Sequence, residues 1–398
     1  MISRLPAVES DPLWALTSEC EQDRRPEKID LVVGVYRDAS GRTPVMRSVQ
    51  EAETRLASGS LSKSYRGLSG NLEFIEGISR FLLGRNSPAT GRQCTIQTVA
   101  GTGALRMLAD FIPRISPHAT VWITDPSYVN HRPIMAAAGL AVKTFRWQED
   151  RQGLDLDAAL EDLGHARPGD VLLLHGCCHN PSGIDPALDH WRAFSRLCVE
   201  KQIIPMIDMA YQGFGDGVDA DAAGLRLMAG EQELMLVAAS CSKNMGLYCE
   251  RTGAAMVIAP DHRPLANIRH TLERIARSNY SMPPDHGAAI AAMLFENPGP
   301  WLAELEACRL RVAGIRRDLG EQLLAVGASE KFQSLRRQKG MFSLLPLDSS
   351  QMLRLRQEFA VYGTSSCRIN IAGLAPHQVS GLARALTAVS ADPGTRLP

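Results

Sequence analysis

The sequence lacks several features that mark common classes of protein. Lysine plus arginine equals aspartate plus glutamate, at 43 residues each, so no net charge attracts nucleic acid or an anionic membrane. No apolar run approaches the length of a membrane span, and the first residues, MISRLPAVESDPLW, carry acids and proline where a secretory signal needs an apolar run. We therefore expect a cytoplasmic protein with no nucleic-acid or membrane partner.

The nine cysteines are odd in number and form no CxxC pair. We expect them to be reduced thiols rather than a disulfide framework. Cys177 and Cys178 lie between His175 and His179, but this spacing fits no common zinc pattern, so we predict no metal site. The GxGxxG and GxxxxGK[ST] patterns are also missing, which argues against dinucleotide and P-loop sites.

What the chain does contain is an alternation of short apolar runs and helix-length amphipathic segments. Its 398 residues, 45% of them hydrophobic, are enough for a large core and a second, smaller unit. Strands that are buried on both faces of a parallel sheet appear in a sequence as short, nearly continuous apolar runs. The runs lie at 121–125, 171–176, 203–208, 234–240 and 254–259. We predict an α/β domain with a largely parallel sheet and helices on both faces.

The C-terminal part has a different pattern. Residues 298–326 read as one long amphipathic helix, opened by proline and closed by Gly327. The segments after it are expected as two strands and two helices, at 340–347 and 367–374, and at 353–363 and 377–389. We predict a small α+β lobe, which the first forty or so residues join.

Two motifs offer groups for an anion at the edge where open α/β sheets bind ligands. In AGTGALR, Gly101 and Thr102 precede an amphipathic helix, whose free N–H groups favour an anion. In SCSKNMGLYCERTG, Ser240, Ser242 and Arg251 offer hydroxyls and a guanidinium to a phosphate dianion. A Gly-Thr-Gly turn alone is more often a plain junction between a loop and a helix. Together, the two motifs predict a phosphate site.

Further candidates for chemistry lie close to these motifs. Most lysines at strand ends are solvated charges, but Lys243 lies between a buried run and a glycine turn, where its pKa can fall enough for imine chemistry. Asp208 ends the run IIPMID, with Tyr211 three residues on. A buried carboxylate keeps the ring nitrogen of pyridoxal phosphate protonated, although an aspartate there is as often a cap. Asn180, in HNPSG, can donate to the phenolate oxygen of that cofactor.

The order of the motifs along the chain is informative as well. They are DPLWAL, VGVYRDASGRTPV, YRGLSG, GTGALR, DPSYVNH, HGCCHNPSGID, MIDMAYQGF, SCSKNMGLYCERTG, NYSMPPDHGA and CRINIAG. In this order the chain resembles the class I aminotransferases of the aspartate and aromatic amino acid group, which are fold type I pyridoxal-phosphate enzymes. The resemblance implies pyridoxal 5′-phosphate as cofactor. It also implies a large domain at 46–309, with a mostly parallel seven-stranded sheet flanked by helices, and a small α+β domain formed by 1–45 and 310–398.

The resemblance further implies a role for each matching residue. Lys243 matches the Schiff-base lysine that also carries the proton, and Asp208 matches the partner of the pyridine nitrogen, with His131 as its support. Tyr211 and Asn180 match the groups on the 3′ oxygen. The residues that match phosphate binders are Gly101, Thr102, Ser240, Ser242 and Arg251, together with Tyr65, a tyrosine lent by the neighbouring subunit. The match of Tyr65 implies a homodimer with shared active sites.

The substrate-binding residues are also implied by the resemblance. Arg368 matches the arginine that binds the substrate α-carboxylate, assisted by Asn180 and the backbone at Gly34. Arg277 matches a partner-subunit arginine that pairs with a distal carboxylate and swings aside for aromatic side chains. The implied reaction exchanges an amino group between a dicarboxylic or aromatic amino acid and a 2-oxo acid such as 2-oxoglutarate.

The chain departs from the family pattern near the reacting centre. Tyr128 stands where a tryptophan usually stacks on the cofactor, Met282 replaces a usual asparagine, and Arg66 adds a charge beside Tyr65. A pocket with Tyr128 and Met282 favours aromatic or other bulky side chains, whereas Arg277 favours dicarboxylic ones. The sequence leaves the preferred donor, the physiological direction and the pathway open.

Two alternative functions stay open at this point. The first is a specialised pyridoxal-phosphate enzyme of secondary metabolism on the same fold, such as a cyclase or eliminating lyase, acting on a modified or basic amino acid. The second is a catalytically silent binding protein. The joint presence of Lys243, Asp208 and Tyr211 argues against the silent protein.

Overall fold

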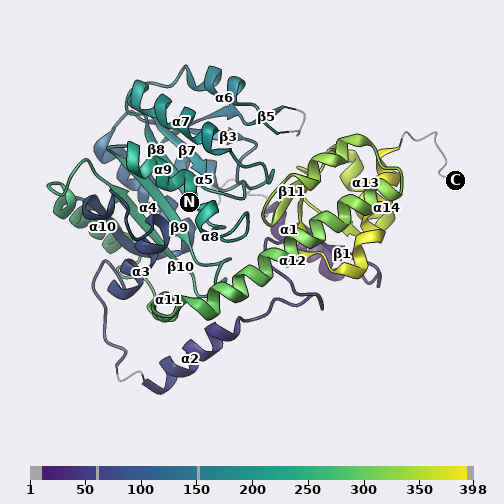
Figure 1. Ribbon diagram of the computed structural model, residues 1–398, viewed down its shortest axis with the longest axis horizontal. Coiled ribbons are helices and arrows are strands. Elements are labelled where there is room, and N and C mark those ends of the chain that lie inside the picture. The colour runs from purple at the N-terminus through teal and green to yellow at the C-terminus, as the bar shows by residue number, and fades with distance from the viewer. Residues whose placement is uncertain (1–10, 60–61, 150–152, 392–398) are drawn as a thin grey trace, which may run out of the picture. The chain divides into compact units, whose positions relative to one another are not determined.

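A computed structural model describes residues 11–59, 62–149 and 153–391 of the chain. The chain divides into two compact units, the larger formed by Pro44–Leu310 and the smaller by Met1–Thr43 with Arg311–Pro398. Figure 1 shows the helices and strands of both units. Among the described residues, no helix is both long and apolar enough to cross a membrane.

The larger unit is built on a seven-stranded sheet with the order β2-β10-β9-β8-β7-β3-β4. Neighbouring strands are parallel except that β10 runs antiparallel to both β2 and β9. The strands are β2 (Gln93–Val99), β3 (Thr120–Asp125), β4 (Ala141–Arg146), β7 (Val171–His175), β8 (Ile204–Met209), β9 (Met235–Ser240) and β10 (Thr252–Ile258). This arrangement confirms the predicted α/β class with a mostly parallel sheet.

Helices cover both faces of this sheet (Figure 1). On one face α4 (Ala100–Ile115) contacts β8, β9 and β10 and is flanked by α5 (His131–Ala137) and α10 (Leu265–Asn279). The second layer consists of helices that contact one another in pairs: α11 contacts α3, α3 contacts α9, α9 contacts α7, and α7 contacts α6. These helices are α3 (Leu72–Leu83), α6 (Leu156–Leu163), α7 (Leu188–Lys201), α9 (Ala223–Glu231) and α11 (His286–Glu296). Their apolar faces and the central strands form the core.

The remaining elements of the larger unit are peripheral to the sheet. They are α2 (Arg47–Gly59), α8 (Val218–Asp221) and a short antiparallel pair, β5 (Gln148–Glu149) with β6 (Gly153–Leu154). Helix α12 (Pro298–Ala325) contributes its residues up to Leu310 to this unit and the rest to the smaller one. Its observed bounds lie within one residue of the predicted long helix.

The smaller unit holds two short pairs of strands. β1 (Ile29–Asp30) and β12 (Val361–Tyr362) are parallel, whereas β11 (Phe342–Leu344) and β13 (Arg368–Asn370) are antiparallel. The helices here are α1 (Pro12–Gln22), α13 (Ser349–Phe359) and α14 (Val379–Ser390), together with the second part of α12. The helix expected at 353–363 is wrong at its end, because Ala360 adopts a positive φ and the next two residues pair with β1.

Candidate active site

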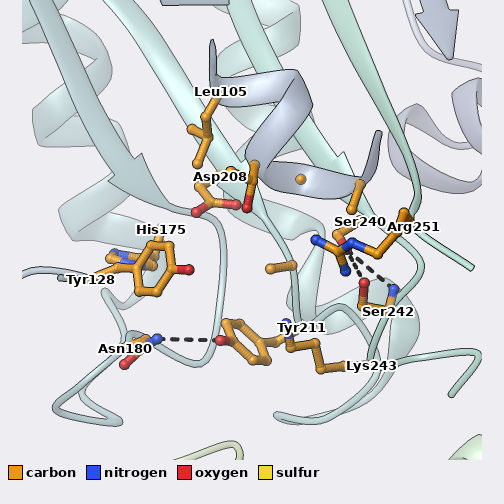
Figure 2. A pocket seen from close by; sticks show the side chains of 14 residues that line it. Leu105, Tyr128, His175, Asn180, Asp208, Tyr211, Ser240, Ser242, Lys243 and Arg251 are labelled. Atoms are coloured by element: carbon orange, nitrogen blue, oxygen red, sulfur yellow. Dashed lines mark hydrogen bonds between the residues drawn. The ribbon is translucent and has the colours of Figure 1, made fainter. Parts of the chain in front are cut away.

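A pocket opens in the larger unit around the C-terminal ends of β7, β8 and β9 and the start of α4 (Figure 2). Its space, which includes a part open to solvent, is about 510 Å³. The pocket brings together ten residues named from the sequence: Gly101, Thr102, Tyr128, Asn180, Asp208, Tyr211, Ser240, Ser242, Lys243 and Arg251. Sites at the carboxyl ends of parallel strands are the general rule for open α/β sheets.

One end of the pocket is suited to an anion. The first turn of α4 has no side-chain cap, so no side chain of the helix start competes for an anion at the positive end of the helix dipole. A Cβ added at Gly101 would lie 3.1 Å from the Cβ of Ser240, so glycine keeps this turn close to β9. The hydroxyl of Ser240 donates to that of Ser242, 3.1 Å away, and the Arg251 side chain lies beside both (Figure 2).

The backbone explains why residues from two motifs meet here. β10 returns antiparallel beside β9, with Gly253 opposite Ser240, so the segment between the strands starts and ends at the same edge of the sheet. The amide of Ala100 then donates to the carbonyl of Arg251 at 2.9 Å. Ala100 and Arg251 both adopt positive φ, at 54° and 53°. These contacts hold the start of α4 against the strand that follows Lys243.

The carboxylate of Asp208 lies at the opposite side of the pocket from this group (Figure 2). It is buried at the end of β8, and one of its oxygens lies 3.0 Å from Nε2 of His131. The hydroxyl of Ser127 contacts the other ring nitrogen of His131 at 2.9 Å. Burial by itself raises the pKa of Asp208, but the hydrogen bond and charge of His131, with the charge of Lys243, more than offset it and leave the pKa below its ordinary value. Asp208 is therefore an anion at neutral pH.

Three histidine rings lie in contact behind the pocket. The ring centroids of His131 and His175 are 4.8 Å apart, and those of His175 and His179 are 4.5 Å apart. Both ring nitrogens of His175 are buried without a hydrogen-bond partner among the described residues. Burial lowers the pKa of His175 to about 3, so this ring is neutral at neutral pH. Burial also holds the pKa of His179 well below its ordinary value.

Tyr211 links the two ends of the pocket. Its hydroxyl accepts a hydrogen bond of 3.3 Å from the side-chain amide of Asn180 (Figure 2). The Nζ atom of Lys243 lies 5.5 Å from the centroid of the Tyr211 ring, within reach of a cation–π contact. Tyr128 lines the facing wall and meets the ring of His131 edge-on, with centroids 5.3 Å apart. An amine, a phenol and a carboxylate thus surround one cavity.

Two predicted residues of the larger unit do not line the pocket. Tyr65 has 92% of its surface exposed. Arg277, in the last turn of α10, is also exposed and donates to the hydroxyl of Ser281 at 3.1 Å. The assignment of both residues to the active site of a neighbouring subunit stays a prediction.

The other two predicted residues, Gly34 and Arg368, belong to the smaller unit. Arg368 is buried on β13, donates to the carbonyl of Val32 at 2.9 Å and lies 4.6 Å above the ring of Phe342. A Cβ added at Gly34 would lie 2.6 Å from the same ring. Phe342 therefore brings these two residues together within the unit.

Four further residues line the pocket but were not predicted as part of it: Ala100, Leu105, His175 and Ala210. His175 faces Asp208 as its direct partner across β7 and β8. Ala210 lies two residues after Asp208. Residues two apart along a strand face the same side, so this spacing is the sequence signal for Ala210. Leu105 lies four residues after Gly101, a spacing that places both on one face of α4.

Two buried groups of side chains have the geometry of metal ligands. In the first, formed by His131, His175 and Asp208, the facing atoms of His131 and Asp208 bind each other. In the second, Asp221 joins Cys177 and Cys178, but its carboxylate accepts backbone N–H bonds from Gly213, Gly215 and Asp216. These bonds use the carboxylate oxygens that a metal would need. The absence of a metal cofactor stays a prediction.

Comparison with known proteins identifies the chain. Residues 26–386 match the family model for aminotransferase class I and II. The chain belongs to this family. It is 40% identical over 395 residues to the aspartate aminotransferase of Escherichia coli strain K12, covering 98% of this chain and 100% of that protein. It is 42% identical to the aromatic-amino-acid aminotransferase of Pseudomonas aeruginosa, with coverage of 98% and 99%.

A solved structure agrees with these relatives. The aromatic-amino-acid aminotransferase from Burkholderia pseudomallei, covalently bound to pyridoxal phosphate, superposes with a TM-score of 0.95 at 36% identity and covers 98% of this chain and 99% of that one. The resemblance to class I aminotransferases is therefore confirmed, and so is the fold type. The relatives support an aminotransferase and not the alternative cyclase or lyase.

Proposed function

We propose that this aminotransferase exchanges an amino group between a dicarboxylic or aromatic amino acid and a 2-oxo acid such as 2-oxoglutarate, with pyridoxal 5′-phosphate as its cofactor. The observation that carries the proposal is the placement of Lys243, Asp208 and an anion-binding helix start around one pocket. When bound, the cofactor supplies an aldehyde that forms an imine with amines and a protonated ring that accepts electrons from the substrate Cα. The residues of the pocket fit each part of that molecule.

The phosphate end is formed by Gly101, Thr102, Ser240, Ser242 and Arg251. The uncapped first turn of α4 supplies N–H donors, and the two serine hydroxyls and the guanidinium supply further ones. A glycine at 101 lets the dianion approach the backbone, because a side chain there would press against Ser240. This end fixes the cofactor without taking part in proton transfer.

Asp208 faces the ring nitrogen in this proposal. Its carboxylate is anionic at neutral pH and is oriented by His131, so it can accept a hydrogen bond from a protonated ring nitrogen and keep the proton there. Tyr211 and Asn180 contact the phenolic oxygen, and the hydrogen bond between them sets the direction of the phenol. Tyr128 provides an aromatic face against the cofactor ring.

Lys243 carries the chemistry of the amino group. Its amine would hold the cofactor aldehyde in the resting enzyme. Once a substrate amine displaces it, the freed amine would take the proton from the substrate Cα and deliver it to C4′ of the cofactor. Lys243 is half-buried and lies next to the Tyr211 ring, at the pocket that the substrate would enter. A second substrate, the 2-oxo acid, reverses these steps in a ping-pong course.

The substrate carboxylates are bound by arginines. Arg368, with Asn180 and the backbone of Gly34, binds the α-carboxylate through its two-pronged guanidinium. Arg277 binds a distal carboxylate from the neighbouring subunit, and Tyr65 reaches the neighbour's phosphate in the same way. The enzyme is therefore a cytoplasmic homodimer, and the exposure of Tyr65 and Arg277 supports this assembly. Residues 46–309 form its large domain, and 1–45 with 310–398 form its small domain.

A spectral experiment tests the proposal. With excess amino acid and no oxo acid, the imine band at roughly 420 nm should give way to the band of pyridoxamine phosphate, because the first half-reaction stops there. A panel of aspartate, glutamate, tyrosine, phenylalanine, tryptophan and basic amino acids identifies the donor. Reduction with borohydride followed by peptide mass spectrometry should find the cofactor on Lys243. A colourless protein that refuses added cofactor, or a band unchanged by every donor, would refute transamination.

A further inference from the structure

We propose that the ion pair between Arg66 and Asp285 is a positioning device that aims Tyr65 at the active site of the partner subunit. The proposal rests on the proposed function, in which Tyr65 reaches the phosphate of the cofactor bound by the neighbour. Arg66 follows Tyr65 directly, and its guanidinium contacts one oxygen of Asp285 through two nitrogens, each at 3.1 Å. Arg66 and Asp285 are therefore positioning residues, not catalytic ones.

The segment that carries Tyr65 has little else to hold it. Tyr65 is 92% exposed, and within residues 62–66 of the described chain the Arg66 pair is the one hydrogen bond or ion pair to a residue outside the segment. The other hydrogen bond there, from the amide of Ser64 to the hydroxyl of Ser62, is local. The ion pair of Arg66 therefore sets the direction in which the neighbouring Tyr65 points.

Asp285 is anchored firmly enough to serve as the fixed end. Its second oxygen accepts a hydrogen bond of 2.9 Å from the side-chain amide of Asn71. Asn71 itself caps α3 by accepting from the amide of Phe74, and its backbone amide donates to Gln97 on β2 at 2.8 Å. The side-chain amide of Gln97 donates to the carbonyl of Pro284 at 2.7 Å. The carboxylate is therefore tied to a helix start and to the central sheet.

The turn between Arg66 and Asn71 is pressed against the same anchor. Gly70 has a φ of 93°, and a Cβ there would lie 2.5 Å from Gln97 and 3.0 Å from Pro283. The carbonyl of Ser69 accepts from the amide of Gln97, and its hydroxyl donates to Glu273 at 2.6 Å. The chain is thus fixed from residue 69 onward, and the ion pair extends this fixed region back to the residue beside Tyr65.

A rival explanation makes the opposite prediction. If Arg66 acted only as a positive charge that attracts the phosphate, Asp285 would oppose it, and removing the carboxylate would strengthen binding of the dianion. If the pair positions Tyr65, removing the carboxylate weakens binding. The sign of the effect of Asp285→Asn on cofactor affinity therefore separates the two explanations. Asparagine keeps an acceptor for Asn71, so the anchor itself remains.

The experiment titrates pyridoxal phosphate into the dimeric apoenzyme and measures the dissociation constant by the imine band. We expect Asp285→Asn and Arg66→Met to weaken binding about two- to fivefold, the range of an exposed ion pair, and Arg66→Lys to retain most of the affinity. Tyr65→Phe should weaken binding about tenfold, because it removes a hydroxyl that meets a dianion. In the Tyr65→Phe background, Asp285→Asn should have no further effect, since no hydroxyl is left to aim.

Matched controls make the result specific. Asp189→Asn breaks a comparable exposed pair with Arg192, 2.7 Å apart on α7, and should leave the dissociation constant unchanged. High salt should reduce the difference between Asp285→Asn and the wild type, because it screens exposed charges. Equal or tighter binding by Asp285→Asn, with Tyr65→Phe still weakened, would overturn this inference alone. A wild-type protein that binds no cofactor would instead overturn the proposed function.

Discussion

Nε2 of His131 and a carboxylate oxygen of Asp208 lie 3.0 Å apart, and both side chains are almost completely buried. A buried carboxylate without such a partner would tend to take up a proton. The imidazole allows Asp208 to stay charged in an apolar place, where its field acts on the cofactor with little screening. Much of the proposed chemistry depends on this contact.

The first prediction concerns the charge of Asp208. Asp208→Asn should slow proton removal from the substrate Cα by about 10²- to 10³-fold, because the ring nitrogen then loses its anionic partner. Asp208→Glu, which keeps the charge, should lose much less. The rate is measured as the loss of the imine band in a single turnover with saturating donor. An asparagine variant with the rate of the wild type would show that the ring nitrogen has no need of the carboxylate.

The second prediction concerns the backbone of the phosphate end. Gly101→Ala should weaken pyridoxal-phosphate binding about tenfold or more, because the new methyl group would lie 3.1 Å from the Cβ of Ser240 and push the helix start away from β9. Gly91→Ala is the matched control, since a Cβ there meets nothing within 4 Å. Titration of both apoenzymes gives the comparison. An equal loss of cofactor affinity in the two variants would indicate a general effect of alanine and would argue against a phosphate site at the start of α4.

The third prediction follows from the neutral ring of His175. Burial lowers its pKa to about 3, below the value of about 6.5 expected in the unfolded chain. Between these two pKa values His175 is protonated in the unfolded chain but not in the folded one. The free energy of unfolding therefore falls as the pH falls from the higher value towards the lower. From pH 7 to pH 5 the loss due to His175 should be about 2 kcal/mol. The neutral variant His175→Gln should lose correspondingly less over the same range.

Urea unfolding of the apoenzymes at pH 5, 6 and 7, at one protein concentration, measures this difference. The other buried histidines, such as His179, are present in both proteins. If the unfolding midpoints of the wild type and the variant fall in parallel with pH, then His175 takes up its proton as readily in the folded as in the unfolded protein.

The fourth prediction concerns substrate binding in the smaller unit. Arg368→Lys should raise KM for the amino acid at least about tenfold and leave the dissociation constant of the cofactor unchanged, because an ammonium cannot form the two parallel hydrogen bonds of a guanidinium. The half-buried Arg354, paired with Glu358 on α13, gives the control Arg354→Lys. Steady-state kinetics with saturating oxo acid measures KM. A normal KM in Arg368→Lys would assign the carboxylate to another group.

The sequence predicted the central strands better than the edges of the sheet. β7 and β9 are buried along their whole length, so they appear as unbroken apolar runs. β4, at one edge, exposes most of its residues and carries lysine, threonine and arginine, so no apolar run marks it. β2, at the other edge, is largely buried but carries four polar residues in QCTIQTV, so it was missed as well. A search for apolar runs therefore finds strands of apolar composition and misses a buried strand that carries polar side chains.

Much of the site could be predicted because its residues occur in short motifs at strand ends. Lys243, Ser240 and Arg251 lie in one segment, and the pocket contains all three. The place of His175 in the pocket is different, because it depends on register across the sheet, where His175 lies opposite Asp208 at a separation that no local pattern encodes. Tyr65 and Arg277 were assigned only through the family resemblance, since nothing in their own segments indicates a ligand.

The antiparallel course of β10 also limits how the enzyme can change. The segment from Ser240 to Arg251 is fixed at both ends. Gly253 pairs opposite Ser240, and the carbonyl of Arg251 accepts a hydrogen bond from the amide of Ala100, so the distance between the two ends is set. Substitutions between Ser240 and Arg251 leave that distance intact. An inserted or deleted residue would instead move the guanidinium relative to the amine of Lys243. The number of residues in the segment from Ser240 to Arg251 is thus as constrained as the identity of Lys243 within it.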